Sequence, residues 1–222
     1  MKQRSADRTI LCRRVIMAVA GILLTGISVA LFNTIAFGTD PFSCLTLGVW
    51  YVTGIPYRFV YMLVNGLLLA GVFFLDRHYI GLATVLNLLF MGSIVELFMP
   101  VFDSWLPGLG LGVKLLFLCL AVILMCFAAS LYFTADLGVS TYDAWALILS
   151  KKKNFPFKLC RISTDIVCTA AGFLMGAVVG VGTVITALGM GPFIEFFNKT
   201  CSGPMLYGTG RKTGENRPFR AD

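Results

Sequence analysis

The chain has 222 residues, of which 58% are hydrophobic and only 13% are charged. An ordinary soluble domain carries roughly 25% charged residues, so this composition excludes a water-soluble globular protein. The net charge of +7 does not indicate nucleic-acid binding, since the chain has no basic, aromatic-rich soluble domain, and membrane proteins collect lysine and arginine on their cytoplasmic segments.

Long uncharged stretches run through the chain, at residues 15–37, 115–135 and 166–194. Uncharged apolar runs of about 18 residues or more are typical of transmembrane helices. The first run exceeds the roughly 7–15-residue apolar core of a signal peptide, so we expect it to be retained as the first span. The sequence therefore predicts an all-α, polytopic membrane bundle whose partner is the lipid bilayer.

The chain is expected to hold two membrane repeats separated by a short connection. Pro and Gly residues in this connection indicate a loop, and the polar C-terminal end predicts a disordered tail. The expected division is a cytoplasmic N-terminal segment (1–14), the first repeat (15–99), a loop (100–112), the second repeat (113–198) and a cytoplasmic tail (199–222). The four hydrophobic pieces expected in each repeat are 15–37, 41–53, 57–75 and 79–98, and 113–135, 141–151, 157–176 and 181–197.

Evidence for this internal duplication comes from matched Gly, Pro, Thr and acidic positions, since leucine matches between apolar helices arise by chance. Fixed-period self-similarity of this kind indicates a repeated structural unit. A shift of 100 residues aligns Gly38 with Gly138, Phe42 with Tyr142, Pro56 with Pro156, Arg58 with Lys158 and Asn65 with Asp165. After one deletion, a shift of 99 aligns Gly81, Thr84, Asn87, Gly92 and Glu96 with Gly180, Thr183, Thr186, Gly191 and Glu195.

The second piece of each repeat decides the predicted topology. A helix of about twelve residues rises only about 18 Å, whereas the hydrocarbon core is about 30 Å thick. Asp143 and Lys151 bound this piece in the second repeat, so we expect a half-helix covered by protein. Three spans per repeat then predict an inverted repeat of six spanning helices plus two half-helices, with both termini cytoplasmic. The alternative is eight spans with parallel repeats, and the distribution of positive charge does not separate the two.

Asp40-Pro41 is the sharpest polar feature of the chain, a turn-forming break within apolar sequence. Pro suits the first helical turn and Asp is a favoured N-cap, so the pair could be no more than a capped helix start. Paired interruptions of this kind also point to a transporter binding site. Asp143 aligns with Ser43 rather than with Asp40, and Ser140 can still cap the second short helix.

Polar residues inside the third and fourth pieces are the other candidates. Asn65 and Asp165 occupy matched positions, and a carboxylate in a membrane helix is costly. Asp165 follows Arg161 at helical spacing, so a local ion pair near the interface is the simpler interpretation. The fourth pieces repeat small and polar residues every three positions, and this face continues to Met91 or Met190. Helix packing is the simpler role for that face, and cavity lining is the second.

Catalysis has little support in the sequence. The only histidine is His78, so neither a His-based triad nor a two-His metal site can be assembled. No nucleotide-binding or hydrolase motif is present, and the seven cysteines occur singly, which is typical of buried, reduced thiols. We therefore expect no enzymatic activity, no cofactor and no metal.

Three stretches resemble a known family: SVALFNTIAFGTDPF at 28–42, GIPYR at 54–58 and GLATVLNLLFMG at 81–92. They are similar to the YczE/YyaS/YitT family of bacterial membrane proteins, whose pattern places a Gly-x-x-Pro-aromatic turn after the first helix and a Gly-Thr-x-x-Asn helix start later. Gly81 and Thr84 depart from this pattern by two intervening residues, whereas Gly182-Thr183 follows it. The resemblance covers about residues 15–197. It implies a bacterial inner-membrane location and no catalytic residues.

The sequence predicts a small-solute or ion transporter with its site at the repeat interface. The alternative is a non-transporting scaffold or accessory factor of an envelope or export system. The small size of the chain is compatible with a homodimer. The candidate substrate-binding residues are Asp40, Pro41, Asn65, Thr84, Asn87, Asp143, Asp165 and Thr183.

Overall fold

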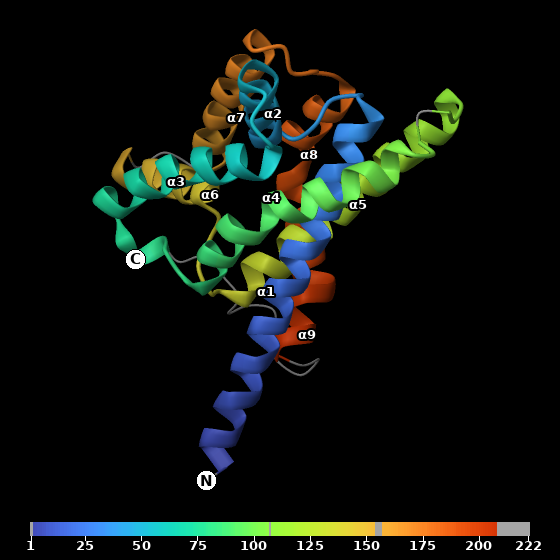
Figure 1. Cartoon of the computed structure of the whole chain (residues 1–222). Helices are drawn as coiled ribbons and strands as arrows, with labels where there is room; N and C mark the ends of the chain where they lie inside the picture. The colour runs from blue at the N-terminus through green and yellow to red at the C-terminus, as the bar shows by residue number, and fades with distance from the viewer. Residues whose placement is uncertain (1, 107, 154–156, 208–222) are drawn as a thin grey trace.

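The structure, a computed structural model, describes residues 2–106, 108–153 and 157–207. All of the regular secondary structure in this part of the chain is helical (Figure 1), as the sequence predicts. The longer helices are α1 (Lys2–Ile35), α2 (Pro41–Thr53), α3 (Tyr57–Leu75), α4 (Leu82–Asp103), α5 (Leu111–Ala135), α6 (Thr141–Lys153), α7 (Phe157–Leu174) and α8 (Val181–Phe197). Three short turns complete the chain: η1 (Arg77–Tyr79), the π-helical η2 (Asn198–Ser202) and α9 (Gly203–Tyr207).

Five helical segments of the described chain are long and apolar enough to cross a membrane. They are Ile10–Ile35, Tyr57–Leu75, Leu82–Asp103, Leu111–Ala135 and Val181–Leu206. The eighteen-residue α7 was expected to be a sixth span, and it is not among the five; its sequence carries Lys158, Arg161 and Asp165. Large apolar side chains cover the outer surface, with Phe74 83% and Leu174 85% exposed. Such a surface suits lipid rather than water.

The connection between the two halves is shorter than expected. Helix α4 continues through Pro100 to Asp103 instead of ending at residue 98, and α5 already begins at Leu111. Proline normally interrupts a helix because it lacks an amide donor. Here aromatic packing holds the last turn, since Trp105 contacts Phe117 of α5 with ring centroids 5.2 Å apart.

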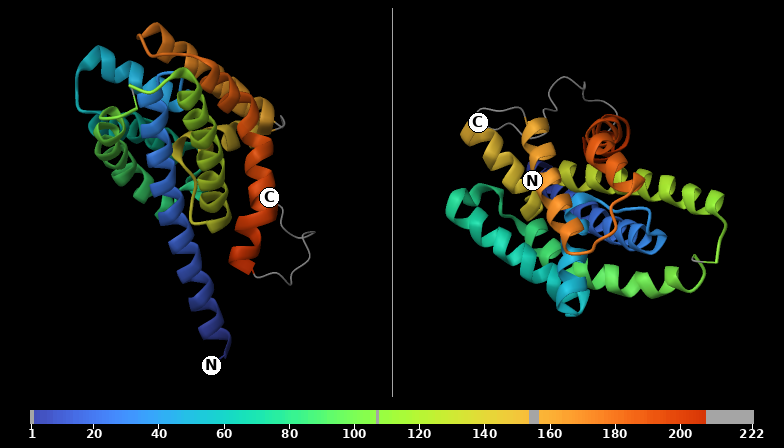
Figure 2. Two further views of the ribbon diagram at one scale, coloured as in Figure 1. Left: turned by 90° about the vertical axis from the view of Figure 1, so that its right-hand side faces the viewer. Right: turned by 90° about the horizontal axis from the view of Figure 1, so that it is seen from above.

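The chain ends also differ from the prediction. Helix α1 begins at Lys2 rather than near residue 15, and its first turns project beyond the bundle (Figure 2). The expected disordered tail is helical as far as Tyr207, where Ser202 and Leu206 are buried against the bundle. Residues 208–222 of that tail, and Pro156 of the repeat alignment, lie outside the described residues.

Helices α1 and α5 form the centre of the bundle and run in opposite directions. Arg14 pairs with Asp136 at 3.6 Å, and Ser28, further along α1, donates to the carbonyl of Ala121 at 2.6 Å. Between them, Gly21 faces the backbone of Ala128. Residues further along α1 contact residues progressively earlier in α5, so the two helices are antiparallel along their whole contact.

Each of the two short helices packs against the third helix of the other half. Helix α2 packs against α7, and α6 packs against α3, as Figure 1 shows. Gly172 permits close approach in the first pair, because a Cβ there would lie 2.4 Å from the carbonyl oxygen of Cys44. In the second pair, the indole of Trp145 donates to the carbonyl of Leu68 at 3.0 Å. At 13 residues each, both helices are about 20 Å long, shorter than the hydrocarbon core.

Two matching turns position the starts of these short helices. Gly38 and Gly138 adopt φ values of 95° and 105°, which favour glycine. The turn at Gly38 accepts a hydrogen bond from Gly182 of α8 through the carbonyl of Phe37, at 2.9 Å. The turn at Gly138 is held in the same way on α4, again at 2.9 Å. The fourth helix of each half, α4 or α8, therefore anchors the turn that precedes the short helix of the other half.

A candidate site between the two short-helix starts

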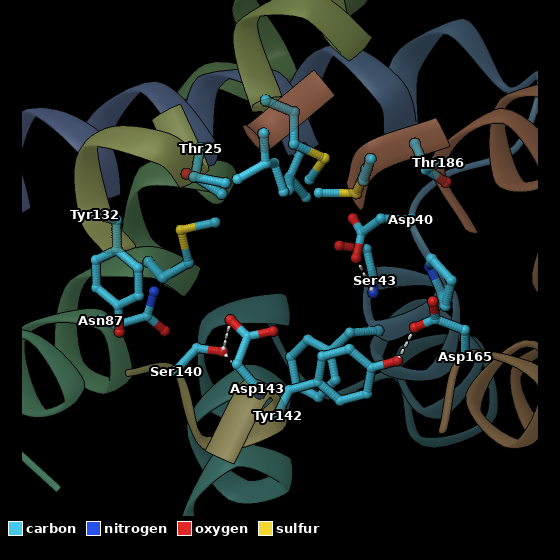
Figure 3. A pocket seen from close by; sticks show the side chains of 18 of the residues that line it. Thr25, Asp40, Ser43, Asn87, Tyr132, Ser140, Tyr142, Asp143, Asp165 and Thr186 are labelled. Carbon is cyan, nitrogen blue, oxygen red and sulfur yellow. Dashed lines mark hydrogen bonds between the residues drawn. The ribbon is translucent and has the colours of Figure 1, made fainter. Parts of the chain in front are cut away.

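A cavity of about 170 Å³ lies where the N-terminal ends of α2 and α6 meet (Figure 3). The rings of Phe42 and Tyr142, which are matched positions of the two halves, contact each other with centroids 5.2 Å apart. Helices α1, α3, α4, α5, α7 and α8 supply the remaining walls. Six of the predicted site residues line this cavity: Asp40, Pro41, Asn65, Asn87, Asp143 and Asp165.

Asp40 caps the start of α2, as its sequence context predicts. Its Oδ2 atom accepts a hydrogen bond from the Ser43 amide at 3.0 Å, and Pro41 occupies the first helical position. The side chain is only 9% exposed. Its other oxygen, Oδ1, has no hydrogen-bond partner among the described residues. One oxygen of this buried carboxylate therefore caps the helix, and the other has no hydrogen-bond partner in the described part of the chain.

The start of α6 uses the same residue types in exchanged positions. Ser140 takes the capping place and accepts the Asp143 amide at 3.2 Å, while its own hydroxyl donates to Asp143 Oδ2 at 2.8 Å. The first half thus has an aspartate at the cap and a serine three residues later, and the second half has the reverse. Each short helix brings one carboxylate to the cavity, and Figure 3 shows both turned toward it.

Arg161 joins two of the carboxylates. Its guanidinium pairs with Asp143 of α6 and with Asp165 of its own helix, the latter at 3.4 Å. The same group lies over the Tyr142 ring, 4.5 Å from its centroid, and the Tyr142 hydroxyl donates to Asp165. The predicted Arg161–Asp165 pair is confirmed. Asp165 is only 4% exposed within the bundle, so this pair forms part of the cavity wall.

Asn65 and Asn87 are held by hydrogen bonds at the opposite wall. The Thr141 hydroxyl donates to the side-chain oxygen of Asn65. The side-chain nitrogen of Asn65 donates to the Tyr61 carbonyl at 2.9 Å. The hydroxyl of Tyr61 donates to Asn87 at 2.8 Å. This chain of hydrogen bonds ties α3 to α4 and α6, so it holds the wall in shape.

Thr84 and Thr183 do not line the cavity, in contrast to the prediction that they bind substrate. The Thr84 hydroxyl donates to the carbonyl of Val139 at 2.6 Å and accepts the Gly81 amide at 3.2 Å. Thr183 accepts the amide of Thr39 at 3.1 Å. Both residues fasten the turns that precede the short helices, which is the packing role that their small-residue surroundings favoured.

Replacing Thr84 with valine is expected to lower the free energy of unfolding by about 1–3 kcal/mol, because a buried amide and a buried carbonyl lose their partner. The matched control is Thr53→Val, whose exposed hydroxyl donates to the carbonyl of Val49 and accepts the exposed amide of Ile55 at 3.4 Å. Its loss should change stability by about 0.5 kcal/mol or less. Denaturant unfolding in detergent micelles measures both. Equal effects of the two variants would contradict the anchoring role.

Several cavity residues were missed by reasoning from the sequence. Arg161 was considered only as a local partner of Asp165, since its pairing with Asp143 depends on how α6 packs on α7. Tyr132 of α5 also lines the cavity, and its hydroxyl has no hydrogen-bond partner among the described residues. Met91 and Met190 were not missed: they continue the small-residue faces of the fourth pieces, for which cavity lining was the second expected role, and both line the cavity. An aromatic residue in an apolar helix gives no signal of which side faces a cavity.

Comparisons with known proteins agree with this description of a membrane bundle. The sequence matches the profile of a family of unknown function, DUF6198, over residues 12–199. The chain belongs to DUF6198. The DUF6198 chain is also 21% identical over 195 residues to the uncharacterized membrane protein YczE of Bacillus subtilis strain 168, covering 87% of this chain and 89% of that protein. This confirms the resemblance to a YczE-like membrane family.

A second relative comes from Haemophilus influenzae strain Rd. It is an uncharacterized protein, 26% identical over 175 residues, which cover 78% of each chain. No solved structure matches the chain. The seven cysteines of this DUF6198 member are free. They were expected to be buried, but only Cys44, Cys126 and Cys160 are, whereas Cys12 and Cys119 are exposed.

Proposed function

We propose that this protein is a transporter or permease for a small solute or ion, with its binding site in the cavity between α2 and α6. The observation that carries the proposal is the meeting of two short, capped helix starts, one from each half, at a cavity that is also lined by three carboxylates. Interrupted helices that meet in this way form the substrate sites of several transporter folds. Polar groups inside a membrane bundle are costly, and they commonly mark a functional pathway.

An internal duplication with inverted topology supports the proposal. The turns at Gly38 and Gly138 have similar backbone angles, and each docks on the fourth helix of the opposite half with the same amide-to-carbonyl contact. Such reciprocal contacts are those of a two-fold arrangement. Helices α1 and α5 are equivalent in the two halves and run antiparallel, as expected if the second half enters the membrane from the opposite side. We propose six spans, with α7 as the sixth beside the five long apolar helices and with α2 and α6 as half-helices.

The arrangement of the chain ends suits this topology. The start of α1 and helix α9 lie toward the same end of the bundle (Figure 2). An even number of spans places both ends on one side of the membrane. The basic residues near the N-terminus indicate that this is the cytoplasmic side of a bacterial inner membrane. We expect no enzymatic activity, and a homodimer remains compatible with the proposal.

Solute flux into proteoliposomes tests the proposal. The purified protein should carry at least one member of a broad panel of amines, amino acids, alcohols, organic acids and inorganic ions, driven by a proton or sodium gradient. Asp40→Asn/Asp165→Asn should lower that flux at least about tenfold, because it removes two of the charges of the site. The matched control is Asp103→Asn, which changes an exposed carboxylate outside the cavity.

Two outcomes would contradict transport. Absence of flux for every solute, with a stable protein partner recovered in detergent, would support the scaffold or accessory role instead. Unchanged flux in the Asp40→Asn/Asp165→Asn variant would place the pathway elsewhere in the bundle.

A further inference from the structure

We infer that the cavity binds a small organic cation, a protonated amine on an apolar body, with the Oδ1 atom of Asp40 as its counter-ion. This inference rests on the proposed function for the place of the site and adds the class of solute. The first argument is charge. Asp40, Asp143 and Asp165 bring three carboxylates to the cavity, and Arg161 is the only basic side chain among its described lining residues. The cavity is therefore acidic before any solute enters.

The contacts among these charged side chains indicate that Asp40 is the counter-ion of the bound cation. Arg161 already forms ion pairs with both Asp143 and Asp165, and the Tyr142 hydroxyl donates a hydrogen bond to Asp165. Asp40 receives only the Ser43 amide, through Oδ2. The remaining oxygen is buried, belongs to a residue that lines the cavity, and has no hydrogen-bond partner in the described part of the chain. A buried carboxylate without a partner is costly, and a bound cation with N–H donors would remove that cost.

The remaining walls suit an apolar body rather than a bare ion. Phe42 and Tyr61 pack edge to face at 5.8 Å beside Asp40, and Phe42 also contacts Tyr142. Aromatic faces attract organic cations, and the Met91 and Met190 thioethers supply an adaptable apolar surface. Divalent ions such as calcium instead need about six or more oxygen ligands. The carboxylates of Asp143 and Asp165 are already paired with Arg161, so they are not free to supply such a shell.

The size of the cavity limits the solute. Sites for drug-sized ligands have volumes of roughly 300–1,000 Å³, whereas this cavity has about 170 Å³. An apolar protein cavity of about 150 Å³ binds benzene. The cavity therefore suits a cation with about the bulk of one aromatic ring. The Tyr132 hydroxyl has no hydrogen-bond partner within the described ranges and lies on the opposite side of the cavity from Asp40 in Figure 3, where it suits a polar group at the far end of such a solute.

Calorimetric titration of the purified full-length protein in detergent tests this inference with benzylammonium as the probe. Benzyl alcohol has the same shape without the charge, and benzoate reverses the charge. We expect benzylammonium to bind at least about tenfold more tightly than benzyl alcohol, and benzoate to show no binding. Sodium and potassium chloride form further arms of the experiment. These comparisons use only the unmodified protein, so they do not depend on whether a variant folds.

Asp40→Asn provides the second measurement. Asparagine is also a favoured N-cap, so the variant should keep the Ser43 hydrogen bond and the α2 start while it loses the charge. We expect at least about a tenfold loss of benzylammonium affinity, with no such loss for the exposed-site control Asp103→Asn. Unchanged affinity in Asp40→Asn would overturn the assignment. Equal binding of benzyl alcohol, preferential binding of benzoate, or saturable binding of sodium or potassium without benzylammonium would overturn it as well.

The binding and flux measurements separate this inference from the proposed function. Charge-dependent benzylammonium binding at Asp40, with no flux of any solute in proteoliposomes, would support the amine site and contradict the proposed transport function. Flux of other solutes together with an absence of amine binding would leave transport standing and remove the amine assignment.

Discussion

Replacing Arg161 with glutamine is expected to lower the free energy of unfolding by about 3–5 kcal/mol, the usual cost of breaking a buried ion pair by removing one partner. The guanidinium pairs with both Asp143 and Asp165. Glutamine cannot neutralise either carboxylate, and both lie within the bundle, 8% and 4% exposed. Denaturant titration in mixed micelles, followed by tryptophan fluorescence, measures the change.

The matched control for this prediction is Arg58→Gln. Arg58 pairs with Glu96 at 3.6 Å, but the two side chains are 50% and 40% exposed, so their separation should cost at most about 1 kcal/mol. Combining Arg161→Gln with Asp143→Asn and Asp165→Asn should recover much of the lost stability, because the uncompensated charges are then gone. Similar effects of Arg161→Gln and Arg58→Gln, or no recovery in the combined variant, would show that Arg161 does not act through these carboxylates.

Gly38→Ala is expected to reduce stability by about 3 kcal/mol or more, because it combines two separate costs. A residue with a side chain pays about 1–2 kcal/mol in the left-handed backbone conformation that Gly38 adopts. A Cβ at this position would also lie 2.6 Å from the backbone nitrogen of Gly180, and crowding of packed groups typically costs a further 1–3 kcal/mol or so. Unfolding in detergent and the monodisperse fraction on size exclusion measure the effect.

Two other glycines separate these contributions. Gly54 has φ +65° with no atom within 4 Å of the added Cβ, so Gly54→Ala should pay only the backbone cost of about 1–2 kcal/mol. Gly66 lies inside α3 with equally open surroundings, and Gly66→Ala should be neutral or slightly stabilising, since alanine favours helix. If Gly38→Ala resembles Gly54→Ala, the contact between the turn and α8 is not a packing constraint.

The two sets of variants address different parts of the site. Arg161 controls the charge balance of the cavity wall, whereas Gly38 controls where the start of α2 lies. Because Asp40 follows Gly38 by two residues, a displaced turn would move the capping carboxylate away from the cavity. We therefore expect binding of an organic cation to be lost in Gly38→Ala even in the fraction of the protein that remains folded.

Much of the site could be predicted from the sequence because it uses local signals. The Asp40-Pro41 pair indicates a capped helix start whatever surrounds it, and the Ser43 amide bonds Asp40 as that signal requires. Matched Gly positions pointed to a second turn at Gly138. Thr84 and Thr183 do not line the cavity. Spacing along a helix shows which residues share a face but not what lies opposite that face.

The sequence by itself determined that this is an all-helical membrane protein with two short polar-capped helices, because hydrophobic run length, prolines and caps act within a few residues of one another. The tertiary structure decided that α2 packs on α7 and α6 on α3, and so brought Asp40 and Asp143 to a common cavity. It also decided that Arg161 joins two carboxylates, while one oxygen of Asp40 has no partner among the residues that the structure describes. These outcomes depend on contacts between residues about a hundred positions apart, and local chemistry does not specify such contacts.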